Sequence, residues 1–167
     1  MIDVARIGEI TEQHLDYQLD VDFKGVVFTV QKALPLLTDG ASIILNSSNT
    51  NARGGSEGIG IYAAIKAAVR SLARTWASEL RDRGIRVNVV SPPGATDTPP
   101  GLNNLASQFI TGPNAAEEFE NQQRGVIPMG RRGTPEEVAN AVVFVASDLS
   151  TYTTGADIPV DGGVNQI

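Results

Sequence analysis

Short apolar runs rich in β-branched residues alternate along this chain with longer stretches in which apolar residues recur at helical spacing. The runs that we predict as strands cover residues 41–48, 85–90 and 156–160. The stretches that we predict as helices cover residues 11–37, 61–83 and 134–147. Strands that alternate with helices form a parallel sheet with helices on its faces. The order predicts one α/β domain over residues 1–167, although three strands are few for such a sheet.

Residues with special backbone preferences lie at the predicted ends of these helices and support the predicted boundaries. Thr11 is suited to N-cap the first helix, because its hydroxyl accepts from a free backbone N–H of the first turn. Pro35 is expected to end or bend the same helix, since proline has no N–H to donate. Gly84 is a natural stop for the second helix, because glycine adopts the left-handed conformation readily.

Two capping boxes are predicted further along the chain. Thr134 and Glu137 have the spacing of an N-cap and its N3 partner, with Pro135 at the first helical position. Asn114 and Glu117 have a similar spacing inside a long excursion that we place at residues 91–133. A connection this long within a compact domain is usually functional.

Composition excludes several classes of function. The net charge of −6 argues against a nucleic-acid backbone or an anionic membrane surface as partner. The absence of cysteine removes disulfides and thiolate chemistry, and it fits a cytoplasmic location. His14 is the single histidine, so we expect neither a histidine metal centre nor a Ser-His-Asp triad. The sequence also has no apolar run of membrane-spanning length and no signal-peptide pattern.

Three glycines, Gly54, Gly58 and Gly60, precede the second helix in the spacing G-x-x-x-G-x-G. A phosphate cradle needs its glycines directly after a strand, so that backbone N–H groups and the helix N-terminus meet the pyrophosphate. The preceding strand is expected to end near Asn46, eight residues before Gly54. We therefore interpret these glycines as loop residues and rank a stand-alone nucleotide binder as the weakest hypothesis.

Tyr62 and Lys66 are spaced i and i+4 near the start of the second helix, so they share a face. A tyrosine hydroxyl has a pKa of about 10, and lowering it to about 7 requires roughly 4 kcal/mol. An ammonium about 5 Å away contributes roughly 3 kcal/mol at an effective dielectric constant of about 20. The lysine is thus expected to make the phenol a usable acid–base catalyst, with a serine such as Ser48 holding a substrate oxygen.

Simpler interpretations exist for each of these residues. Tyrosine and lysine four residues apart are often a half-buried aromatic ring beside a solvated charge, and spacing alone favours this view. Ser48 is equally suited to a turn in which it hydrogen-bonds its own backbone. Asp22 lies on the apolar face of the first helix, where a buried carboxylate is costly unless paired. The plainer explanation is a kink that lets Asp22 reach water.

Taken together, the segments resemble the classical short-chain dehydrogenase/reductases. The resemblance covers nearly the whole chain, and the order and spacing of its parts make it specific. The matching segments are DVDFKGVVFTVQKALPLL, ASIILNSS followed by YAAIKAAVRSLARTWASEL, IRVNVVSPPGATDTP, and GRRGTPEEVANAVVFVASDLSTYTTGADIPVDGG. This family implies a Rossmann-like parallel sheet with flanking helices, here truncated to about three visible strands.

The resemblance also implies roles for particular residues. Tyr62 is implied as the general acid/base, Lys66 as the group that lowers its pKa and binds the nicotinamide ribose, and Ser48 as the group that orients the substrate. Residues implied to line the nicotinamide side are Pro93, Gly94 and Thr98. The excursion at 91–133 is implied to form the substrate lid. The implied reaction is hydride transfer between NAD or NADP and an alcohol/carbonyl pair.

The chain departs from the family pattern at several positions. Asp22 occupies the place of the family's catalytic asparagine, and we include it among the catalytic candidates. The interval from Ser48 to Tyr62 is one residue longer than usual, so Ser47 or Asn49 is an alternative for the serine position. Pro92 is an extra proline before the Pro-Gly pair. The N-terminal βαβ units, with the glycine-rich loop and the residue that selects NAD or NADP, are absent from the sequence.

Two hypotheses about function follow. The first is an NAD(P)-dependent oxidoreductase that acts on a small-molecule alcohol or carbonyl. The alternative is an inactive remnant of the family, or an oligomerising interaction module, that lacks the dinucleotide-binding half. The strand at 41–48 is expected to become a sheet edge, and an exposed apolar edge invites pairing with another chain. We therefore expect a chain of this length to form a homo-oligomer or to be the remnant of a longer protein.

Overall fold

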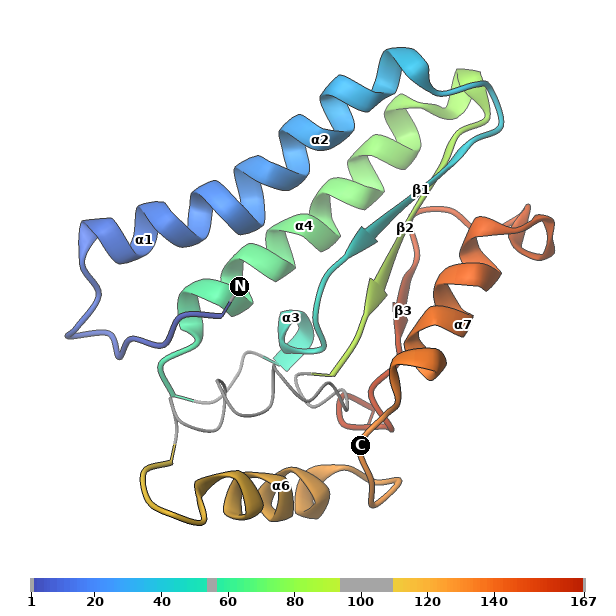
Figure 1. Cartoon of the computed structure of the whole chain (residues 1–167). Helices are drawn as coiled ribbons and strands as arrows, with labels where there is room; N and C mark the ends of the chain where they lie inside the picture. The colour runs from blue at the N-terminus through green and yellow to red at the C-terminus, as the bar shows by residue number, and fades with distance from the viewer. Residues whose placement is uncertain (1, 54–56, 94–109, 167) are drawn as a thin grey trace.

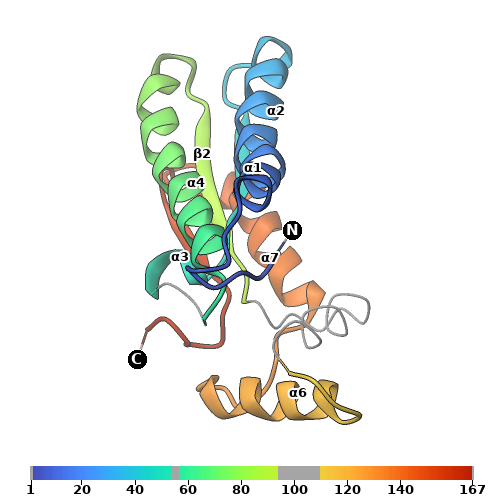
Figure 2. The same ribbon diagram turned by 90° about the vertical axis from the view of Figure 1, so that its left-hand side faces the viewer.

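The computed structural model describes residues 2–53, 57–93 and 110–166. These residues form a small parallel sheet with helices on both faces (Figure 1). Helix α4 (Gly60–Glu79) packs on one face of the sheet, and α7 (Pro135–Ala146) packs on the other. Figure 2 shows α2 (Gly25–Ala33) running beside α4. The predicted Rossmann-like α/β arrangement is confirmed.

The sheet contains the three predicted strands, in the spatial order β1-β2-β3 and all parallel. They are β1 (Ser42–Asn46), β2 (Arg86–Ser91) and β3 (Asp157–Pro159). Helices cover both faces, so the middle of the central strand is mostly apolar, and Val87, Val89 and Val90 are almost fully buried. Among the described residues, β1 pairs only with β2, so β1 is an edge strand, as predicted.

The first predicted helix is divided into several segments. It comprises α1 (Glu12–Leu19), a π-helical segment η1 (Asp20–Lys24), α2 and a short 3-10 turn η2 (Leu34–Leu36). Thr11 caps α1 as predicted, because its hydroxyl accepts from the backbone N–H of His14. Pro35 lies in the 3-10 turn, and α2 ends just before it. The π segment was not predicted, and it places Asp22 on the side of α4.

Helix α4 supplies the main contact with the sheet. Val69 and Ala73 on this helix pack in one cluster with Ile43 and Leu45 of β1 and with β2. The helix continues into a 3-10 turn and stops at Gly84, whose φ of 60° is the left-handed conformation expected at a helix end. Apolar spacing along the sequence correctly predicted this buried face.

Two local predictions were wrong. No helix was predicted between the first strand and the second helix, but Thr50–Arg53 form one helical turn, α3. The turn begins where the N–H of Thr50 donates to the Ser48 hydroxyl. Helix α6 (Ala115–Val126) begins after Asn114, yet the side chain of Asn114 makes no capping bond. Its backbone is not extended, as a capping residue's usually is, so the expected capping box does not form.

The capping box at α7 is confirmed. The Thr134 hydroxyl accepts from the N–H of Glu137, and the Glu137 carboxylate accepts from the N–H of Thr134. The same carboxylate binds the Arg131 guanidinium at 2.6 and 2.9 Å. The hydrogen bond from Arg131, followed by that from Thr134, lowers the pKa of Glu137 to about 2.

This lowered pKa predicts a pH-dependent effect of Glu137→Gln. A depressed carboxyl pKa stabilises the fold above its ordinary value of 4.5 and ceases to do so as pH falls towards about 2. We therefore expect the variant to have a lower melting temperature than the parent at pH 7, with the difference shrinking between pH 4.5 and 2. Thermal unfolding followed by circular dichroism at several pH values measures it. The exposed Glu136→Gln is the control, and an equal difference at pH 7 and pH 2 contradicts the prediction.

Candidate active site

The carboxyl ends of β1 and β2 bring the predicted polar residues together. The N–H of Asn49 donates to the carbonyl of Pro92 at 2.9 Å, which joins the two segments just beyond the strands. Ser47 and Ser48 follow β1 directly, and both are buried. In open parallel sheets ligands bind outside the carboxyl ends of the strands, so this is the expected place for a site.

Tyr62 and Lys66 lie on the buried face of α4, as their spacing predicted. Both side chains are buried, and Lys66 Nζ lies 5.3 Å from the centroid of the Tyr62 ring. The alternative of a solvated lysine beside a half-buried ring is therefore wrong. Burial holds both groups in fixed positions beside the carboxyl end of β1.

The hydroxyls of Ser47 and Ser48 have different surroundings. A hydrogen bond from the Ser48 hydroxyl lowers the pKa of Tyr62, so Ser48 is the serine on the side of the phenol. The hydroxyl of Ser47 instead donates to the backbone carbonyl of Lys66 at 2.9 Å. Asn49 Oδ1 accepts from the Ser48 hydroxyl at 3.5 Å. Ser48 also accepts from the N–H of Thr50, which is the contact expected of a turn residue.

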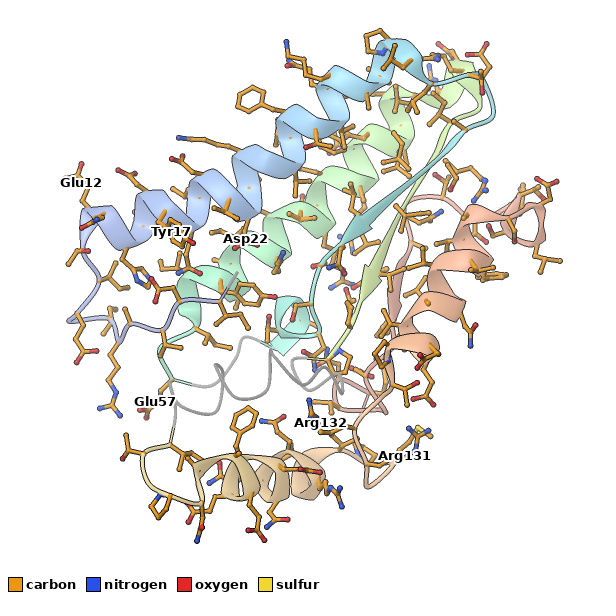
Figure 3. All side chains as sticks on the ribbon, in the orientation of Figure 1. Glu12, Tyr17, Asp22, Glu57, Arg131 and Arg132 are labelled. Atoms are coloured by element: carbon orange, nitrogen blue, oxygen red, sulfur yellow. The ribbon has the colours of Figure 1, made fainter. Side chains whose placement is uncertain are left out.

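Asp22 is the residue whose surroundings differ most from the plainer expectation. It does not reach water: the side chains of Asp22 and Lys66 are only 8% and 9% exposed. Lys66 Nζ donates to Asp22 Oδ1 at 3.2 Å. Figure 3 labels Asp22 where the long N-terminal helix faces α4. Asp22 lies within the π segment, which packs against α4, and this packing brings its carboxylate to Lys66.

The expectation that Lys66 makes the Tyr62 phenol acidic is not met. Burial raises the pKa of Tyr62, the hydrogen bond from Ser48 lowers it, and the Asp22 carboxylate raises it further. The sequence argument considered one ammonium and left out two effects. These are the low polarity of the buried position and a carboxylate that neutralises the ammonium.

Gly58, which precedes α4, lies against the N-terminal segment of the chain. Gly58 has a φ of +82°, and a Cβ built on it would lie 2.5 Å from Val4 Cγ1. The backbone N–H of Ala5 also donates to the Gly58 carbonyl at 2.9 Å. The N-terminal segment therefore occupies the space beside Gly58. Gly54 lies outside the described residues, as do the cofactor candidates Gly94 and Thr98.

Comparison with known proteins identifies the family. Residues 2–165 match the family model described as enoyl-(acyl carrier protein) reductase. A short chain dehydrogenase family protein from Francisella tularensis superimposes over 100% of this chain and 68% of its own, with a TM-score of 0.88 and 27% identity. The chain belongs to the short-chain dehydrogenase/reductase family. This confirms the resemblance inferred from the motifs.

Further relatives within the short-chain dehydrogenase/reductases are enzymes by name. Oxidoreductase asL5 of Sarocladium schorii is 39% identical over 163 residues, covering 96% of this chain and 61% of the relative. A 3-oxoacyl-[acyl-carrier-protein] reductase of Thermotoga maritima is 37% identical, covering 96% and 61%. Aldohexose dehydrogenase from Thermoplasma acidophilum superimposes with a TM-score of 0.88 and 27% identity, covering 98% and 64%. The chain thus spans 61% of the length of both curated relatives.

Some residues that shape the site carried no catalytic motif in the sequence. Asn88 is fully buried in β2, and its amide bonds the Thr153 carbonyl and the Ala156 N–H. The signal was available, since Asn88 interrupts an otherwise apolar strand. Asn165 donates from its side chain to the carbonyl of Asn49 at 2.5 Å, and no pattern predicted this link. Among the described residues, no helix has the length and apolar character needed to cross a bilayer.

Proposed function

We propose that this chain is an NAD(P)-dependent oxidoreductase that interconverts a small-molecule alcohol and carbonyl. The observation that carries the proposal is the buried arrangement of Ser48, Tyr62 and Lys66 at the carboxyl ends of the strands. Membership of the short-chain dehydrogenase/reductases and the names of its relatives support the same chemistry.

The described residues fit the nicotinamide half of such a cofactor. Lys66 and Tyr62 offer an ammonium and a hydroxyl in one buried position, which suits the hydroxyls of a ribose. Pro93 follows β2 on the same side of the sheet, and we propose that Gly94 and Thr98 continue this lining. When bound, the nicotinamide supplies or accepts the hydride. Gly58 does not offer a pyrophosphate cradle, so we assign no residue to that half.

The roles of the side chains follow from their positions. Ser48 holds the substrate oxygen by a hydrogen bond, and Tyr62 exchanges a proton with that oxygen. Lys66 keeps the phenol in place and offers its remaining N–H groups to the ribose. We propose that residues 91–133, which include α6, form a lid over the substrate. We propose further that the protein works in the cytoplasm as a homo-oligomer.

Tyr62→Phe tests the proposal directly. The variant loses one hydroxyl and is expected to keep its fold, while the rate of NADH or NADPH consumption with a panel of ketones falls at least about 100-fold. Absorbance at 340 nm measures the rate, and nicotinamide fluorescence measures binding of each cofactor. Tyr152→Phe is the matched control, since Tyr152 is fully exposed. Lack of binding of either cofactor at millimolar concentration, or equal rates in the two variants, contradicts the proposal.

The open edge of β1 favours a second candidate, an oligomerising interaction module. The carbonyl of Ala41 and the N–H of Ser47 bond to β2, so the alternating backbone groups of Ile44 face away from the sheet. A groove of about 620 Å³ lies there, lined by residues of β1 and of α2 such as Val26 and Val30. A second copy is the natural occupant, because an edge strand pairs with its own copy antiparallel across a two-fold axis.

Ile44→Pro tests whether the open edge of β1 forms the contact between two copies. The substitution removes the edge-facing N–H and is tolerated in an edge strand, so we expect a parent dimer to become a monomer while the fold persists. Sedimentation velocity measures the mass, and Ile44→Val is the control. A parent protein that is monomeric at tens of micromolar, or an Ile44→Pro variant that stays dimeric, contradicts the assignment.

A further inference from the structure

A buried ion pair with no net charge, formed by Lys66 and Asp22, lies beside Tyr62. Lys66 Nζ and Asp22 Oδ1 are 3.2 Å apart, and less than a tenth of either side chain is exposed. A single ammonium near the ring would stabilise the ionised phenol. A carboxylate in contact with that ammonium cancels most of this attraction, because the two charges act on the phenol with opposite sign.

Other charged groups near this end of α4 are paired. On the N-terminal segment and α1, Asp3 lies 3.4 Å from His14. Arg6 lies 3.1 Å from Glu57, and this pair is screened because both side chains are mostly exposed. Helix α3 also carries Arg53, whose side chain is outside the described residues.

The Asp22 carboxylate acts electrostatically on the Tyr62 phenol. After burial, which is the larger cause, the Asp22 carboxylate raises the pKa of Tyr62. Asp22 is held by the π segment on the side of α4, so its place is built into the backbone rather than reached by a flexible side chain. Asp20 and Lys24 of the same segment pair with each other at 2.6 Å in solvent, which leaves Asp22 as its buried acid.

Resting on the proposed function, we propose that the Asp22–Lys66 pair keeps Tyr62 protonated at neutral pH and so sets this site for reduction of a carbonyl substrate. Asp22 is then a positioning residue that acts through Lys66 and Tyr62. The favoured substrates are ketones or aldehydes that present their oxygen to the Ser48 and Tyr62 hydroxyls. Oxidation of the corresponding alcohol is disfavoured at the same pH.

The proton balance explains this direction. A bound dihydronicotinamide would supply a hydride from its C–H bond to the carbonyl carbon, and the electron pair of the C=O bond would move to oxygen. That oxygen takes the proton of Tyr62 Oη, and solvent water returns a proton to the tyrosinate. Alcohol oxidation needs the tyrosinate at the start. Its population falls tenfold for each pH unit below the pKa of the phenol.

Titration of the protein without cofactor tests the inference. Absorbance of tyrosinate at 295 nm is followed from pH 6 to 11, and subtraction of the Tyr62→Phe curve removes Tyr17 and Tyr152. We expect Tyr62 to ionise above pH 10, the ordinary value for tyrosine, and at a lower pH in Asp22→Asn than in the parent protein. Asp20→Asn is the matched control, because it removes an exposed acid from the same segment. Circular dichroism at each pH confirms that the fold persists.

The possible outcomes separate the inference from the proposed function. A midpoint for Tyr62 near pH 7 in the parent protein, or an unchanged midpoint in Asp22→Asn, overturns the inference. If Asp22→Asn does not fold, Asp22→Ser takes its place, because the parent midpoint alone does not separate the effect of Asp22 from that of burial, the larger cause. With cofactor, ketone reduction is expected to be flat from pH 6 to 8, whereas alcohol oxidation rises about tenfold per pH unit. A high midpoint without turnover contradicts the proposed function, and a low midpoint with turnover contradicts only the present inference.

Discussion

Replacement of Lys66 by methionine is expected to lower the free energy of unfolding by about 3–5 kcal/mol. The substitution keeps most of the aliphatic stem but removes the ammonium that contacts Asp22 at 3.2 Å. The carboxylate then stays in a position that is only 8% exposed, without the opposite charge that compensated its desolvation. Urea denaturation at pH 7, followed by circular dichroism, measures the loss.

Two variants show whether the buried charge is the cause. The double variant Asp22→Asn/Lys66→Met is expected to recover much of the lost stability, because it buries no charge. Lys24→Met removes an ammonium from a closer pair, at 2.6 Å from Asp20, in which both side chains are more than half exposed. Water screens that pair, so little change is expected. A loss in Lys66→Met no greater than in Lys24→Met shows that solvent reaches the Asp22–Lys66 pair.

The course of the chain was largely predictable from the sequence. Buried parallel strands and amphipathic helices have different apolar periods, so the three strands, and their alternation with helices along the chain, were predicted correctly. The π segment at Asp20–Lys24 was missed because the helical period continues through it without interruption. The helical turn at Thr50–Arg53 was missed because its residues are common in loops. Local hydrogen bonds, rather than apolar periodicity, produce both features.

The candidate site was predictable only in part. The proximity of Tyr62 and Lys66 follows from their spacing within one helix, and the structure confirms it. The choice of Ser48 over Ser47 depends on which hydroxyl faces Tyr62 and which faces the backbone of α4. The direction of the Tyr62 pKa depends on burial and on Asp22, which is 44 residues away from Lys66 along the chain. Such effects arise from tertiary structure and leave no local pattern.

A second large loss of stability is expected from substitution of Asn88, because its side chain joins β2 to the segment that leads into β3. Its side chain is fully buried, donates to the Thr153 carbonyl at 2.8 Å and accepts from the Ala156 N–H at 3.1 Å. Asn88→Ala removes both bonds and leaves two partly buried backbone groups without them. We expect a loss of about 3 kcal/mol, since a buried polar group left unsatisfied costs about 1–3 kcal/mol.

The same substitution is expected to loosen β3 before the rest of the sheet. The strand is short, and its register with β2 begins at Val89 and Asp157, next to the Asn88 contacts. Hydrogen exchange should therefore rise first at Val89 and Ala156, whose backbone groups are bonded to each other. Thr153→Ala is the control, because it keeps the backbone carbonyl that Asn88 binds. A loss below about 1 kcal/mol in Asn88→Ala, or equal losses in the two variants, would show that water replaces the amide and that apolar packing alone positions β3.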